Sequence, residues 1–65
     1  MPISLAESAA LENEKRALQR ELEQVENELR RLGGYGYSER TAPLQYRIRS
    51  IQARIHTIDV RLRQR

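Results

Sequence analysis

The segment GGYGYSERTAP, residues 33–43, contains residue types common in ligand loops: three glycines, two tyrosines and an arginine. Backbone amides of a glycine-rich turn can bind a phosphate, but the known nucleotide loops need a longer pattern. The dinucleotide fingerprint has a third glycine and a preceding strand, and the Walker loop ends in lysine followed by serine or threonine. The sequence has neither pattern. We therefore expect no nucleotide site here.

The remaining side chains suited to chemistry are one histidine and nine carboxylates. His56 has no cysteine and no second histidine at metal-ligand spacing. The carboxylates recur along two charged helical patterns, where a raised pKa and an enclosed substrate pocket are hard to form. We predict that the chain is not an enzyme and has no catalytic residue, cofactor, metal or small-molecule substrate.

Two apolar runs indicate the elements that carry these side chains. From Leu11 to Leu32, and again from Leu44 to Leu62, leucine, isoleucine and valine recur with the alternating four-and-three spacing, which gives twelve seam side chains. This spacing is typical of a coiled-coil seam. Ser8 and Lys15 are the polar exceptions at seam positions of the first run. The glycines between the runs permit the positive backbone angles that end a helix and turn the chain. The sequence predicts one all-α domain, an antiparallel two-helix hairpin of coiled-coil type, with helix 5–32, loop 33–42 and helix 43–64.

Both helix starts have cap signals. Ser4 followed by Glu7 has the spacing of a capping box. Pro43 is tolerated in a first turn, with Thr41 or Ser38 available as the cap.

Charges on the two runs are complementary. Residues 1–32 have seven glutamates against five basic residues, whereas residues 41–65 have six arginines against one aspartate. If the chain folds back at residues 33–42, we expect three ion pairs along one edge: Glu14 with Arg61, Glu21 with Arg54, and Glu28 with Arg47. Exposed pairs contribute only about 0 to 1 kcal/mol each, so we expect them to select register more than stability. Lys15, at a seam position, is expected to place its ammonium between Glu12 and Asp59.

The predicted core is small for an independent fold. A chain of 65 residues without cysteine has neither a large core nor disulfides. Each leucine, isoleucine or valine contributes about 1.5 to 3 kcal/mol only when fully buried, and a two-helix layer leaves its seam partly exposed. We therefore expect a protein partner or self-association as a homo-oligomer, for which a four-helix bundle is the simplest form.

Three groups of residues are candidates for that contact. Residues 1–7 are expected to project beyond the hairpin. A stripe on the second helix faces away from the seam, and the corner is rich in tyrosine and arginine, which are common interface anchors. Each also has a purely structural interpretation, respectively a frayed terminus, scattered surface residues and loop packing. The candidate protein-binding residues are Ile3, Leu5, Tyr35, Tyr37, Arg40, Tyr46, Ala53 and Val60.

Nucleic acid is the alternative partner. Eleven of the twelve basic residues are arginine, a residue suited to phosphates, although a codon bias would give the same composition. Three of the arginines on the second helix are already expected to pair with glutamates. The alternative nucleic-acid-binding residues are Arg49, His56, Arg63 and Arg65.

The opening MPISLAE lacks a basic segment followed by a long apolar one, so we expect no signal peptide and no membrane span. Together with the absence of cysteine, this favours a cytoplasmic or otherwise intracellular protein, or one incorporated in a virion.

The order of long helix, glycine-tyrosine corner and shorter basic helix, with the opening MPISLAE, distantly resembles small phage head–tail joining proteins. Those proteins place a short β-hairpin between their helices, and GGYGYSERTAP has no alternating strand pair. The resemblance implies a small structural, adaptor or inhibitory accessory of a phage or bacterial assembly, and it assigns no residue.

Overall fold

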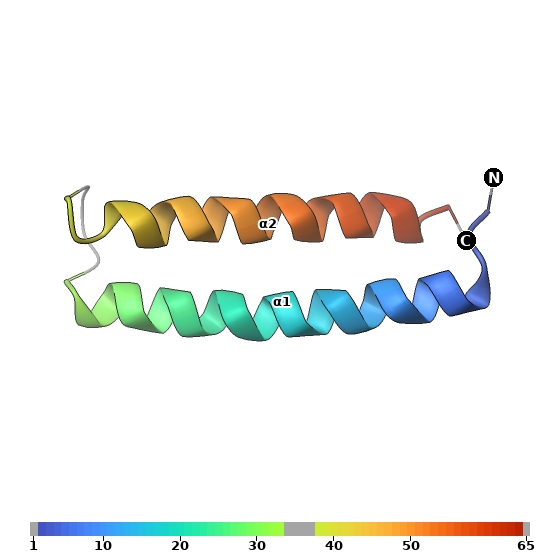
Figure 1. Ribbon diagram of the computed structural model, residues 1–65, viewed down its shortest axis with the longest axis horizontal. Helices are drawn as coiled ribbons and strands as arrows, with labels where there is room; N and C mark the ends of the chain where they lie inside the picture. The colour runs from blue at the N-terminus through green and yellow to red at the C-terminus, as the bar shows by residue number, and fades with distance from the viewer. Residues whose placement is uncertain (1, 34–37, 65) are drawn as a thin grey trace.

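The structure, a computed structural model, describes residues 2–33 and 38–64. It contains two helices, α1 (Leu5–Arg31) and α2 (Ala42–Leu62), which pack against each other along their length. The helices are antiparallel, and the described ends of the chain lie together at one end of the rod (Figure 1). The molecule measures 43 × 16 × 12 Å. The expected all-α helical hairpin is therefore confirmed.

α1 begins at a side-chain cap. Ser4 has extended backbone angles, and its hydroxyl oxygen accepts a 3.0 Å hydrogen bond from the backbone N–H of Glu7. The carboxylate of Glu7 binds Arg61 on α2. The Ser4 half of the predicted capping box is thus present, and the Glu7 side chain links the first turn of α1 to α2.

α1 ends at the first glycine of the corner. Leu32 is the C-cap residue, and Gly33 has φ +95°, in the left-handed region that glycine enters without strain. The Gly33 N–H donates a 3.1 Å hydrogen bond to the carbonyl of Arg30, as in the usual glycine-ended helix. Because the helix ends here, Leu32 is 45% exposed instead of buried in the seam. Gly34 and Gly36 lie outside the described residues.

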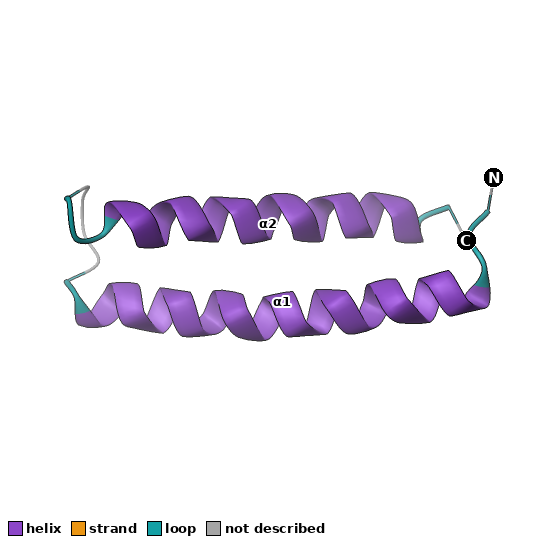
Figure 2. Cartoon of the chain, in the orientation of Figure 1, coloured by secondary structure: helices purple, strands orange, loops and turns teal. Residues whose placement is uncertain are grey.

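α2 begins after a turn in which two hydroxyl residues bind each other. The Thr41 hydroxyl oxygen accepts from the Ser38 N–H at 3.0 Å, and the Ser38 hydroxyl oxygen accepts from the Thr41 N–H at 3.3 Å. Thr41 is buried, although its side chain does not cap α2 itself. Both predicted cap residues are therefore used, but in the turn that precedes the helix. Figure 2 shows the short non-helical segments at the corner and at the chain ends.

The core between the helices is thin. Of the twelve leucine, isoleucine and valine side chains at seam positions, only Val25, Ile51 and Ile58 are buried, and Ile58 is the most enclosed, at 1% exposed. Ser8, the polar exception nearest the start of α1, is also buried. Most of the other seam side chains are half-buried, as expected where a single helix covers another. Full burial of an aliphatic side chain contributes about 1.5 to 3 kcal/mol, so most seam residues contribute less than they would in a layered domain.

Candidate protein-binding surface

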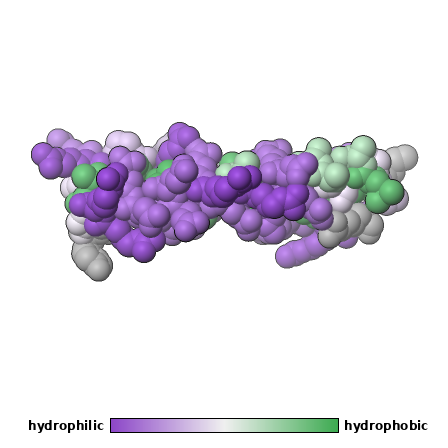
Figure 3. All heavy atoms as spheres, turned by 90° about the horizontal axis from the view of Figure 1, so that it is seen from below, coloured by the Kyte–Doolittle hydropathy of each residue, from purple (hydrophilic) through white to green (hydrophobic). Residues whose placement is uncertain are grey.

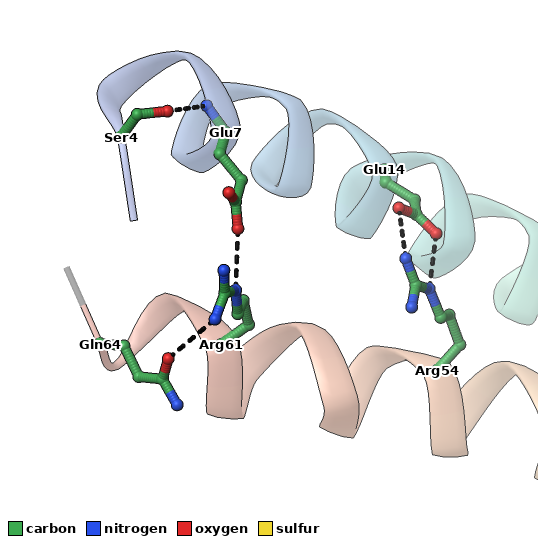
Figure 4. A network of polar contacts seen from close by, with 6 residues as sticks. All are labelled: Ser4, Glu7, Glu14, Arg54, Arg61 and Gln64. Carbon is green, nitrogen blue, oxygen red and sulfur yellow. Dashed lines mark hydrogen bonds and ion pairs between the residues drawn. The ribbon is translucent and has the colours of Figure 1, made fainter. Parts of the chain in front are cut away.

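Ion pairs occupy one edge of the hairpin, but with a different register from the one expected. Figure 4 shows two of them, Glu7 with Arg61 and Glu14 with Arg54. A third joins Glu21 to Arg47. Each arginine therefore pairs with the glutamate one heptad earlier than predicted. Glutamates recur every seven residues along this edge of α1, so both registers bring opposite charges together and the heptad pattern does not distinguish them.

The pair of Arg54 and Glu14 has the most specific geometry of the set. Two guanidinium nitrogens of Arg54, Nε and Nη2, donate to the two carboxylate oxygens of Glu14 at 2.7 and 2.9 Å. These hydrogen bonds, and secondarily the guanidinium charge, lower the pKa of Glu14 below its ordinary value. The same hydrogen bonds raise the pKa of Arg54. Such forked pairs fix the relative position of two side chains more closely than a lysine pair does.

The first turn of α1 is joined to α2 by an ion pair that the sequence did not predict. The Arg61 Nε donates to Glu7 at 2.8 Å, and its Nη1 donates to the Gln64 side chain at 3.0 Å. The expectation that residues 1–7 project wholly beyond the hairpin is therefore wrong for Glu7.

On the opposite edge, Lys15 behaves as predicted. Its Nζ lies 2.6 Å from an Asp59 carboxylate oxygen, so the one lysine in the seam is neutralised across the two helices. An open hollow of about 700 Å³ adjoins this pair, lined mainly by polar side chains that include Glu12 and Gln19. Arg63 also lines this hollow, and Lys15 and Asp59 bind each other within it.

The side of α2 that faces away from α1 carries an apolar stripe. Tyr46, Ala53 and Val60 recur every seven residues and are all exposed, Tyr46 at 74% and Val60 at 41%. We call these three residues the outer apolar stripe. Seven residues make nearly two helical turns, so the three side chains follow one line along the helix.

A row of basic side chains runs beside that stripe. Arg49, His56 and Arg63, here called the outer basic row, each lie three residues after a member of the stripe and are exposed. Residues three or four apart are neighbours on a helix surface. Within residues 2–33 and 38–64, the structure records no hydrogen bond or ion pair for the side chains of this row.

A second apolar area lies where α1 begins. Figure 3 views the face formed by α1, and its largest apolar area is at the end that holds the start of the helix. Leu5 is 92% exposed there, and the three neighbouring alanines, Ala6, Ala9 and Ala10, are exposed as well. Ile3 is half-buried. The expected lack of intramolecular cover therefore applies to Leu5 and only in part to Ile3.

The described part of the corner includes Arg40 but neither of its tyrosines. Arg40 is exposed beside α2. Tyr35 and Tyr37 lie outside the described residues, as does Arg65 of the nucleic-acid alternative. The structure therefore brings Tyr46, Ala53 and Val60 onto one face and places Leu5 at the opposite end of the rod from the corner (Figure 1).

Among the residues that the structure describes, no group of three histidine, cysteine, aspartate or glutamate side chains is arranged to hold a metal ion. Neither described helix is both long and apolar enough to cross a membrane.

No family model, curated protein or solved structure matches the chain. The resemblance to phage head–tail joining proteins therefore gains no support from a family match.

Proposed function

We propose that this chain is a non-enzymatic helical hairpin that binds another protein, as a structural, adaptor or inhibitory subunit of a larger assembly. The proposal rests on the exposure of large apolar side chains. Leu5 and Tyr46, two of its largest apolar side chains, are 92% and 74% exposed, whereas only three seam residues are buried. Apolar surface of this kind gains free energy when a partner removes it from water.

The edges of the hairpin favour contact through its outer faces. One edge is occupied by the pairs of Glu7, Glu14 and Glu21 with arginines, and the other by the pair of Lys15 and Asp59. A partner at either edge would need to break or bury these charges, which is costly. A partner that contacts the outer apolar stripe or the exposed Leu5 does not need to break or bury these ion pairs.

Site-specific photocrosslinking tests the proposal. A photoreactive phenylalanine analogue replaces Tyr46 in one variant and Leu5 in another, with Gln24 on the exposed side of α1 as the matched control position. After irradiation in an extract of the source organism, we expect a discrete protein adduct from position 46 or 5 and none from position 24. Equal adducts at all three positions, or no protein adduct at any, would contradict protein docking.

Nucleic acid is the second candidate, and one observation favours it. The outer basic row has no described anionic partner, whereas Arg47, Arg54 and Arg61 on the same helix are all paired. Phosphate binding falls steeply as salt rises, because bound counterions are released. If this alternative holds, binding of a single-stranded oligonucleotide should weaken at least tenfold between 50 and 200 mM salt, and a protein crosslink at position 46 should not form.

A further inference from the structure

We infer that the outer face of α2 binds an amphipathic helix with carboxylates along one edge, contributed by a different protein. This inference rests on the proposed protein-binding function and specifies the chemistry of the partner. Its basis is the juxtaposition of the outer apolar stripe with the outer basic row along the whole of α2.

The apolar contact has the periodicity of helix packing. Tyr46, Ala53 and Val60 are spaced as one side of a coiled-coil interface would be, and two of them are 74% and 41% exposed. The small side chain of Ala53 lies midway between the larger two. It allows the backbone of a second helix to approach closely at the centre, with Tyr46 and Val60 packing on either side of that approach.

The charge beside the stripe is of one sign. Arg49, His56 and Arg63 flank it on one side, and the neutral residues Ser50, Thr57 and Gln64 flank it on the other. The Thr57 hydroxyl already donates to the Ala53 carbonyl at 3.1 Å, and Gln64 accepts from Arg61. The polar side chains of this face without a described partner are therefore mainly those of the outer basic row. A partner helix complements it with glutamate or aspartate on the corresponding edge only.

A second copy of the chain does not complement this face. If two α2 helices packed antiparallel about Ala53, each basic row would meet the other basic row, with Arg49 near His56 of the other copy. If they packed in parallel, each row would meet neutral residues. No aspartate or glutamate lies on this face of α2 in either case. Charge therefore disfavours packing of α2 on the α2 of a second copy. The exposed side of α1 carries glutamates but no large apolar side chain between Leu5 and Leu32, so α1 of a second copy does not match the stripe either, and a partner of different sequence is favoured.

Two designed peptides test this inference directly. Each is a 21-residue helix with leucines at seven-residue intervals; one carries glutamates along one flanking edge, and the matched peptide carries lysines there. Fluorescence anisotropy with the intact chain should show at least tenfold tighter binding of the glutamate peptide. Reversal of the row in the double variant Arg49→Glu, Arg63→Glu should invert this preference. Neither arginine joins a described ion pair, so helicity measured by circular dichroism should be retained.

Two further variants test whether the apolar stripe contributes to binding in addition to charge. Ala53→Gln places bulk at the centre of the stripe and should weaken binding of the glutamate peptide at least tenfold. Ala17→Gln, on the exposed side of α1, should leave it unchanged.

Several outcomes would overturn the inference. These are equal affinity for both peptides, insensitivity to Ala53→Gln, tighter binding of a single-stranded oligonucleotide than of the glutamate peptide, or a stable dimer through α2 in sedimentation equilibrium. Failure here together with a protein crosslink at position 46 would reject the acidic helix and leave the proposed function intact. Failure here with no protein crosslink at either position 46 or position 5 would reject both.

Discussion

Two rows of basic side chains on α2 differ sharply in their surroundings. Arg47, Arg54 and Arg61 bind glutamates on α1, whereas Arg49, His56 and Arg63 are exposed and have no described anionic partner. Both rows recur every seven residues on the same helix, so composition and spacing do not separate them. The difference arises from the direction in which each row faces once the chain folds back. Three of the five arginines at positions 47–63 therefore bind glutamates within the fold, and the other two have no described anionic partner.

The largest expected effect distinguishes the inner and outer apolar residues of α2. Ile58 is 1% exposed, and Ile58→Ala should lower the free energy of unfolding by about 2 to 5 kcal/mol through lost burial and cavity formation. Val60→Ala, two residues away but on the outer stripe, should change it by less than about 0.5 kcal/mol. Urea titration followed by circular dichroism measures both. Equal losses would show that the seam is not where the structure places it.

Charge reversal compares the two basic rows at one end of α2. Arg61→Glu would place a like charge against Glu7 and should destabilise the hairpin by about 1 kcal/mol. Arg63→Glu is the matched control, because it places the same charge near the same helix end but has no described ion pair to break. It should cost less than about 0.5 kcal/mol. Thermal unfolding at low salt gives both values, and a larger loss for Arg63→Glu would reverse the roles assigned to the rows.

A double-mutant cycle tests which glutamate each arginine meets. Alanine replacements of Glu7 and Arg61, singly and together, should give a coupling of about 0.5 kcal/mol, typical of an exposed ion pair. The corresponding cycle for Glu14 and Arg61, the pair that the heptad pattern predicted, should give no measurable coupling. Coupling between Glu14 and Arg61, with none between Glu7 and Arg61, would instead support the ion pairs expected from the sequence.

The smallest expected effect is the response to acid. Hydrogen bonds from Arg54 lower the pKa of Glu14 in the folded chain below its ordinary value of 4.5. The pair therefore stabilises the hairpin above that ordinary value, and its contribution is lost as pH falls through the lowered folded-state pKa. Unfolding between pH 6 and pH 3 should be less pH-dependent in Glu14→Gln than in the wild type. An identical pH dependence of the two proteins would argue against the pair.

The hairpin itself followed from the sequence, because alternating intervals of four and three fix which side of each helix is apolar and the glycines allow the turn. The Ser4 cap and the pair of Lys15 with Asp59 were predicted for similarly local reasons. The partners within the other ion pairs were not predicted. Because glutamates recur every seven residues along this edge of α1, two of them lie near each arginine in the same helix packing, and the pattern did not show that Arg61 would bind Glu7 and not Glu14.

The candidate surface was predictable to a similar extent. Heptad position placed the outer apolar stripe away from the seam, and the structure places its members on the exposed side of α2. The partial burial of Ile3 was not predicted, because Ile3 precedes α1 and the heptad pattern of the helix does not extend to it.

Exchange of arginine side-chain protons, measured by solution NMR, tests the contrast between the two rows most directly. The Nε–H protons of Arg54 and Arg61 donate to carboxylates and should exchange with solvent several-fold more slowly than those of Arg49 and Arg63. A nuclear Overhauser effect should also join Arg61 to Glu7. Equal exchange rates in the two rows, or a contact from Arg61 to Glu14 in place of Glu7, would contradict the division of α2 into a paired row and an available one.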